Sequence, residues 1–199
     1  MMKTIFTLLL LLLSLAGFSQ LEDIGPNGIS VGANIAHVKY KGNYSDTLTG
    51  NRIGLRIGAF RVIPLFGNLK LQPELDYSQT GDKIKTTDSS HSKLKLDYAS
   101  IPLLLKYQLA SGFSFYAGPE IDFLLNAKKT NTFSGTTSVV SVRNQYKSYL
   151  LSLPIGIDLT IPVGVVFSAR YQFDLSGISN VTGRQARSYV ASITMGYRF

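Results

Sequence analysis

Apolar and polar residues alternate with a period of two along most of the chain. In residues 188–199, Tyr189, Ile193 and Tyr197 lie at odd positions, and small or polar residues fill nearly all the even ones. Successive side chains of a strand point to opposite faces, so this period indicates a β-strand with one apolar face. The same alternation recurs in residues 29–40, 52–63, 69–78, 94–109, 113–128, 149–161 and 165–174. The pattern predicts eight strands and no internal helix.

The connections between these strands alternate in length. Long polar connections are expected at 41–51, 80–93, 129–146 and 175–186, and short ones at 64–68, 110–112 and 162–164. All long loops then lie at one end of the sheet, and all tight turns lie at the other end with both termini. Two strands are less regular, near His37 and near Tyr98. A β-bulge, or a strand that extends beyond a membrane, would explain the change near Tyr98.

Alternation alone does not say which face is inside, because a soluble sandwich or barrel buries its apolar face and a membrane barrel exposes it to lipid. Three features favour the membrane barrel. Strands of about 10–13 residues exceed the usual 5–6 of soluble domains. Aromatic residues gather at both strand ends, and the polar face carries charges of both signs, which a closed interior must pair. The predicted lumen network comprises Arg52, Arg56, Lys70, Glu74, Asp76, Lys106, Glu120, Asp122, Asp158, Arg170, Asp174 and Arg198.

The expected fold is therefore all-β: an eight-stranded antiparallel up-and-down transmembrane β-barrel. Unpaired backbone groups are not tolerated in lipid, so the last strand must close on the first. A barrel of this size is filled by its own side chains, and we expect a plugged lumen. Its paired charges are interpreted as structural, with an ion or proton path as the alternative.

The N-terminus reads as a secretory signal peptide. Lys3 precedes an apolar run, and Gly17 and Ser19 occupy the small-residue positions of a cleavage site. We predict a signal peptide at 1–19 and a barrel domain at 20–199; a retained anchor helix is the alternative. The absence of cysteine excludes lipidation, disulfides and thiolate metal sites.

Several stretches resemble a known family. LQPELDYSQTG (71–81), LDYASIPLLLKYQL (96–109), FYAGPEIDFLLNAK (115–128), FSARYQFDLSGIS (167–179) and the terminal MGYRF are similar to the small outer-membrane β-barrel proteins of Bacteroidetes, called PorT-like or OmpX-like. The resemblance implies an outer-membrane barrel with periplasmic termini and extracellular long loops. It also implies that Tyr197 and Phe199 form the C-terminal signal read by the barrel-assembly machinery. Alternatively, Phe199 only completes an aromatic band.

Catalytic chemistry has little support in the sequence. His91 lies in DSSHSK, where neighbours within one loop seldom build a Ser/His/Asp triad, and His37 lies near a strand end. Neither histidine shows a metal-ligand pair, and the glycine-rich GNRIGLRIG (50–58) lies in a strand, unlike a phosphate loop. We expect no catalytic, metal or cofactor site.

The chain has more basic than acidic residues, and several of the basic residues lie in the expected long loops. The formal net charge is +8, and an exported protein seldom meets nucleic acid, so anionic lipid is the expected counterpart. Candidate contacts to lipopolysaccharide are Lys83, Lys85, Lys93, Lys128, Lys129 and Arg143. Simply solvated loops are the alternative. Residues 129–146, rich in Thr, Ser and Val, could extend a hairpin whose edge accepts a strand from a protein partner.

These observations favour a small non-enzymatic barrel with an envelope-structural or surface-interaction role. An accessory role in type IX protein secretion, as for PorT, and an enzyme acting on lipid or peptide are the alternatives. The sequence names neither the ligand nor the oligomeric state.

Overall fold

The computed structural model describes residues 25–41, 49–87, 90–133, 136–181 and 185–199. The predicted signal peptide, 1–19, lies outside the described residues. No helix in the described ranges is long and apolar enough to cross a membrane. The elements are β1 (Asn27–Lys41), β2 (Thr49–Gly50), β3 (Arg52–Arg61), β4 (Ile63–Phe66), β5 (Leu69–Thr87), β6 (Ser90–Ala110), β7 (Phe113–Ala117), β8 (Glu120–Phe133), β9 (Thr136–Ser141), the 3-10 turn η2 (Arg143–Gln145), β10 (Tyr149–Thr160), β11 (Val165–Asp174) and β12 (Gln185–Arg198).

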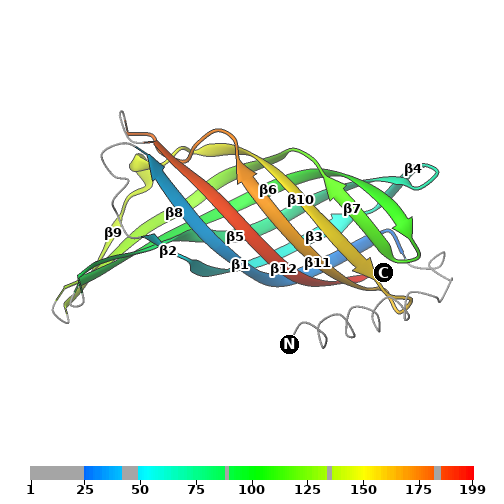
Figure 1. Cartoon of the computed structure of the whole chain (residues 1–199), viewed down its shortest axis with the longest axis horizontal. Helices are drawn as coiled ribbons and strands as arrows, with labels where there is room; N and C mark the ends of the chain where they lie inside the picture. The colour runs from blue at the N-terminus through cyan, green and yellow to red at the C-terminus, as the bar shows by residue number, and fades with distance from the viewer. Residues whose placement is uncertain (1–24, 42–48, 88–89, 134–135, 182–184) are drawn as a thin grey trace, which may run out of the picture.

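The strands form one antiparallel sheet that closes on itself (Figure 1). β1 pairs with β12 along its whole length, from Gly28 opposite Arg198 to Lys41 opposite Gln185. Consecutive short strands share neighbours: β3 and β4 both pair with β5, and β7 and β8 both pair with β6 and β10. We call each position in the barrel wall a stave, whether one strand or two consecutive short strands occupy it. The described strands then form the eight staves expected from the sequence, and β9 is an additional strand paired with β8.

Both ends of the barrel match the alternation of connection lengths. The β6–β7 and β10–β11 turns lie at the same end as the C-terminus, and Gly112 and Gly164 take positive φ angles of 78° and 86° there. These angles are strained for residues with a side chain, so glycine allows the tight turns. We call this the turn end, and the opposite end the loop end.

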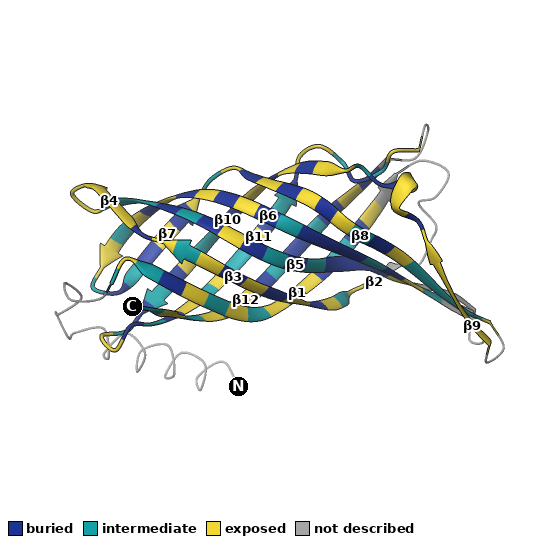
Figure 2. Cartoon of the chain, turned by 180° about the vertical axis from the view of Figure 1, so that it is seen from behind, coloured by how far each residue is buried: buried dark blue, intermediate teal, exposed yellow. Residues whose placement is uncertain are grey.

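The staves expose their apolar residues and bury their polar ones (Figure 2). On β6, Ile101, Leu103 and Leu105 are exposed on the outer face, whereas Ser100 and Lys106 are buried in the lumen. The outer face carries an aromatic row near each end. At the loop end, Tyr77, Phe123 and Tyr149 lie at one level on neighbouring staves, with Ala99 between Tyr77 and Phe123. At the turn end, Tyr107 lies beside Phe115.

The burial pattern inverts beyond the loop-end aromatic row. Here the inside of the barrel is apolar, as in a soluble protein, and a cluster of buried side chains caps the lumen. The cluster consists of Val38, Leu94, Leu96, Tyr98, Leu124, Ala127, Val142, Tyr146, Leu150, Ile178 and Ala186. The irregularity that the sequence shows near Tyr98 marks this transition from a polar to an apolar interior.

A β-bulge accompanies the transition. The β6–β8 register shifts between Asp97 and Tyr98, so that Asp97 pairs with Asn126 but Tyr98 pairs with Leu124. The extra residue is Leu125 on β8. A one-residue insertion exchanges the two faces of a strand. The outer face of β8 therefore passes from Ile121 and Phe123 to Asn126 and Lys128, which simple alternation would have placed in the lumen.

Two of the four expected loops are strands instead. β5 and β6 run for 19 and 21 residues, well beyond the expected 10–13, and form a hairpin where residues 80–93 were expected to be a loop. β8 and β9 likewise form a hairpin within 129–146. Together they project from the loop end as a sheet, which we call the blade (Figure 1). The expected loop at 80–93 was wrong, because polar residues on both faces do not exclude a strand once it leaves the lipid. For 129–146, the structure shows the extended hairpin that the sequence had left open.

Candidate functional site

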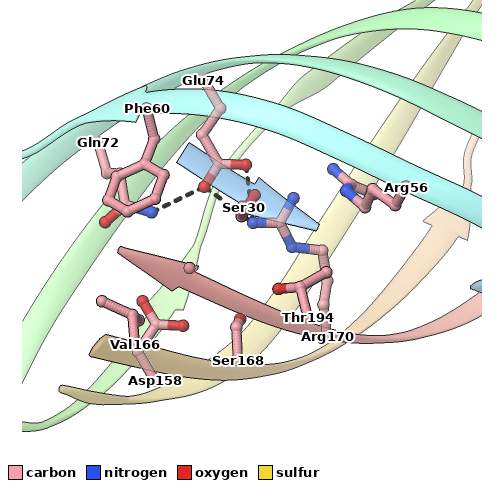
Figure 3. Close-up of a pocket in the computed structure, with 11 residues that line it drawn as sticks. Ser30, Arg56, Phe60, Gln72, Glu74, Asp158, Val166, Ser168, Arg170 and Thr194 are labelled. Carbon is pink, nitrogen blue, oxygen red and sulfur yellow. Dashed lines mark hydrogen bonds and ion pairs between the residues drawn. The ribbon is translucent and has the colours of Figure 1, made fainter. Parts of the chain in front are cut away.

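The lumen is crossed at mid-height by a belt of ion pairs. Arg56 on β3 pairs with Asp76 on β5 and lies 3.5 Å from Glu120 on β8. Arg170 on β11 donates to both carboxylate oxygens of Glu74 at 2.9 and 2.8 Å (Figure 3). It also lies 3.7 Å from Asp76 and 3.9 Å from Glu120. Two arginines thus bind three carboxylates from opposite walls of the barrel.

A second ion pair lies closer to the turn end. Lys106 on β6 donates to Asp158 on β10 at 2.6 Å, and both side chains are buried. Gln72 joins it to the belt, accepting from Lys106 at 3.3 Å and donating to Glu74 at 2.7 Å. Buried charges are costly unless they are paired and hydrogen-bonded, and this network supplies both conditions.

Asp122 is held by neutral donors. Ser100 donates to one carboxylate oxygen, and Ser152 and Gln172 donate to the other at 2.7 and 3.0 Å. These donors stabilise the carboxylate without an opposing charge. The sequence analysis selected charged residues only, and therefore missed four neutral members of the network: Gln72, Ser100, Ser152 and Gln172. All four are at even positions, as are the charged residues that face the lumen.

The Tyr116 ring packs against the belt inside the lumen. The Tyr116 hydroxyl lies 2.8 Å from the Ser168 hydroxyl and accepts from Arg170 Nε at 3.1 Å. The Arg170 guanidinium carbon also lies 5.1 Å from the centre of the Tyr116 ring. Gly156 makes room for this ring, since a Cβ there would lie 2.4 Å from it.

Two small cavities lie in the lumen, one on either side of the belt. The turn-side cavity, of about 20 Å³, is lined by Glu74, Asp158 and Arg170 among others (Figure 3). The loop-side cavity, also about 20 Å³, includes Tyr98 and Asp122 in its lining. Each has room for about one water molecule. The ionic belt lies between the two cavities, and the apolar cap lies between the loop-side cavity and the loop end.

Not all of the predicted lumen charges join this network. It contains Arg56, Glu74, Asp76, Lys106, Glu120, Asp122, Asp158 and Arg170. The other four lie towards the barrel ends. Lys70 donates to Gln108 at 2.6 Å, and Arg198 donates to the carbonyl of Gly25 at 3.2 Å, both near the turn end.

The remaining two predicted lumen charges lie at the loop end. Asp174 accepts from the backbone N–H groups of Ser176 and Gly177, at 3.0 and 2.9 Å, and from that of Ser188 at 3.3 Å. It therefore fixes the start of the β11–β12 connection. Arg52 donates to the carbonyl of Thr80, away from the belt.

A lysine patch occupies the outer face of the blade. Lys83 lies directly opposite Lys93 on the neighbouring strand, and Lys95 lies directly opposite Lys128. Directly opposed residues share a face, as do Lys93 and Lys95 two positions apart on β6. The β5–β6 register is continuous from Asp76 to Lys85, so this is the same face that carries the exposed apolar residues. These four residues define the lysine patch.

Among the described residues, one acidic side chain pairs with the patch. Asp97 lies 3.4 Å from Lys95, and Asn126 donates to the other oxygen of Asp97 at 3.2 Å. Lys83, Lys93 and Lys128 are exposed. Another cationic pair, Lys39 opposite Arg187, occupies the outer face of β1 and β12 beyond the loop-end aromatics.

Three predicted lipid contacts are not among these four residues. Lys129, next to Lys128, points to the other face of β8. The exposed Arg143 donates to the carbonyl of Leu125 at 2.8 Å, which ties η2 to the β-bulge. Lys85 lies opposite His91 near the blade tip, where the side chains are outside the described set.

The histidines and the C-terminal aromatics lie far apart. His37 is on the outer face of β1, opposite Tyr189. Tyr197 and Phe199 are exposed at the turn end, and the Phe199 amide donates to the carbonyl of Asn27 at 2.9 Å. Within the described ranges, no group of three or more His, Asp or Glu side chains is arranged to hold a metal ion.

The barrel is similar to solved outer-membrane proteins. Ail, the attachment invasion locus protein of Yersinia pestis, matches with a TM-score of 0.52 and 16% identity, over 88% of this chain and 99% of that chain. Ail in complex with the heparin analogue sucrose octasulfate gives 0.53 and 18%, over 88% and 99%. Neisserial surface protein A gives 0.51 and 19%, over 86% and 97%. At these identities the likeness shows the fold alone.

No curated protein matches the sequence. The family model for the outer membrane protein beta-barrel domain matches residues 19–181. That match spans most of the chain and agrees with the closed sheet and its exposed apolar face. The chain therefore belongs to the outer membrane protein beta-barrel domain family, and it is a small outer-membrane β-barrel protein.

Proposed function

We propose that this protein is a closed, non-enzymatic barrel that binds phosphorylated lipid of the outer leaflet through the lysine patch. In this proposal the loop end and the blade face the cell exterior, and the turn end and both termini face the periplasm. The observation that carries the proposal is the presence of two pairs of directly opposed lysines on the outer face of the blade.

Opposed like charges need a counter-charge. Cross-strand partners have Cβ atoms about 4.5–5.5 Å apart, and like charges at this separation destabilise a sheet. Asp97 offsets at most one of the four lysines. A phosphate group placed between two lysines converts the repulsion into two charge-assisted hydrogen bonds. The two adjacent lysine pairs therefore suit a lipid headgroup that carries two phosphates, such as that of lipopolysaccharide.

The height of the patch also suits a headgroup. Lys95 lies four residues beyond Ala99 of the loop-end aromatic row, which marks a lipid–water boundary in this class of barrel. A rise of about 3.3 Å per residue along a strand tilted by ~40° places Lys95 roughly 10 Å beyond that row. Anionic headgroups lie in this zone, and a basic residue near such a surface contributes about 1 kcal/mol.

The test compares two double variants that remove the same charge from the same end of the barrel. Lys95→Gln with Lys128→Gln removes one opposed pair. Lys129→Gln with Lys147→Gln is the control, because Lys129 is on the other face of β8 and Lys147 donates to the Ser176 carbonyl at 2.6 Å. The probe is phosphorylated lipopolysaccharide, with its dephosphorylated form as the reference, titrated into detergent-solubilised barrel.

At about 1 kcal/mol per lysine, the patch variant should bind the phosphorylated form roughly 30-fold more weakly. The control variant should bind it as the wild type does. Equal losses in both variants would reduce the effect to net charge and contradict a defined site.

A closed barrel also predicts electrical behaviour. Purified protein inserted into a planar bilayer should give no sustained ion current, because the belt and the apolar cap fill the lumen. A stable single-channel current would refute this part of the proposal and leave the lipid site standing.

A further inference from the structure

Strand β9 forms an open edge of the blade. The described sheet ends at β9, which pairs with β8 on one side. All six of its residues, TTSVVS, are exposed. Val139 and Val140, one on each face, are 61% and 51% exposed.

The register shows which backbone groups face outward. The Val142 N–H donates to the Ala127 carbonyl on β8 at 3.0 Å, and the β8–β9 register continues this pairing, with Val140 opposite Lys129. In an antiparallel pair, alternate residues exchange hydrogen bonds with the partner strand. Thr136, Ser138 and Val140 therefore point their backbone groups at β8. Thr137, Val139 and Ser141 point theirs at the free edge.

The usual protections of an edge strand are missing from β9. Natural sheets block their edges with Lys, Pro, inward charges, bulges or very short strands. β9 contains only Thr, Ser and Val, which favour extended backbone, and its register with β8 is regular. The edge thus presents three N–H and three C=O groups in a row that can continue the sheet.

We propose that the β9 edge accepts an extended, acidic segment of another protein by strand addition. The positive charge of the blade favours an acidic segment as the occupant. Lys128 and Lys129 of β8 lie directly behind the edge, opposite Ser141 and Val140, and the chain carries a net charge of +8. A second copy would bring two lysine-bearing blades together, whereas a segment with acidic residues on its faces is attracted by both lysines. Small apolar residues in that segment would cover Val139 and Val140.

Hydrogen exchange of the full-length barrel in detergent micelles tests the proposal. The probe is a short synthetic peptide that alternates Val and Thr and carries Glu at both ends. With the peptide at about ten times its Kd, exchange of the Thr137, Val139 and Ser141 amides should slow by roughly tenfold. The Ser138 and Val140 amides, already bonded to β8, should change little. A peptide with Lys at both ends should bind more weakly.

Two variants separate backbone pairing from side-chain contact. Val139→Pro removes one free-edge donor without touching the β8 ladder, and proline is tolerated on that side of an edge strand. Val139→Thr keeps the donor. Peptide binding should be lost in the proline variant and kept in the threonine variant. Equal loss in both, protection elsewhere on the barrel, or self-association that Val139→Pro abolishes would each overturn the proposal.

Discussion

Arg170 should be the side chain whose loss most weakens the barrel. It makes two hydrogen bonds to Glu74, at 2.9 and 2.8 Å, and one to Tyr116 at 3.1 Å. The change Arg170→Met keeps much of the side-chain volume but removes the cation. Glu74 then retains the hydrogen bond from Gln72, at 2.7 Å, inside a closed lumen.

Removing one partner of a buried ion pair costs about 3–5 kcal/mol, because the other charge stays buried without its counter-charge. With a urea m-value of about 2 kcal/mol per molar, the unfolding midpoint should fall by roughly 2 M. The chain has no tryptophan, so unfolding should be followed by circular dichroism and by the gel mobility of folded barrel.

The matched control is Arg61→Met. Arg61 is exposed and makes a single hydrogen bond to Asn27 at 3.2 Å, so its loss should cost less than about 0.5 kcal/mol. The double variant Arg170→Met with Glu74→Met removes both charges and should recover much of the stability. Equal costs for Arg170→Met and Arg61→Met would refute the view that the belt stabilises the barrel.

Two further predictions concern buried groups of different kinds. Asp82 is fully buried in the blade base, beyond the membrane-spanning part, and burial raises its pKa to about 7, against the opposing effect of the Lys83 and Gly50 backbone N–H groups. Because the pKa of Asp82 is higher in the folded than in the unfolded protein, protonated Asp82 stabilises the folded state. This stabilisation is complete below pH 3.8 and is lost as pH rises through about 7. At about 1.4 kcal/mol per pKa unit, the loss in free energy of unfolding is roughly 4 kcal/mol. In urea unfolding, the stability of Asp82→Asn relative to wild type should therefore rise between about pH 5 and about pH 8. Parallel pH profiles of the two proteins would contradict the assignment. Gly156→Ala should lower the free energy of unfolding by about 1–3 kcal/mol, because its Cβ would lie 2.4 Å from the Tyr116 ring and 2.5 Å from the Ala169 carbonyl oxygen. The control is Ser168→Ala, which deletes a hydrogen-bond partner of Tyr116 without adding volume. An unchanged unfolding midpoint for Gly156→Ala would show that the ring moves freely.

The barrel itself followed from local pattern. The alternation of Ile101, Leu103 and Leu105 with Ser100 and Lys106 gives a strand with one apolar face wherever it is placed. Strands of this kind, joined by turns of alternating length, have few ways to satisfy their backbone groups in lipid other than closure. Charges of both signs on the polar face then had to lie inside, and eight of the twelve predicted residues meet in one network.

The blade and its surfaces did not follow from the pattern. Outside the lipid, water satisfies both faces of a strand, so residues 80–93 and 129–146 carry no periodic signal that separates a hairpin from a loop. The sequence indicated an irregularity near Tyr98 on β6, but only the change of partner between β6 and β8 shows that the extra residue is Leu125 on β8.

The sequence by itself determined the closed, inside-out barrel, because period and charge are properties of neighbouring residues along one strand. Only the tertiary structure decided which lysines share a face, which acids share an arginine and which backbone groups remain at an edge. Those facts depend on register between strands, and a shift of one residue, such as that at Leu125, moves Lys128 from the lumen to the outer surface.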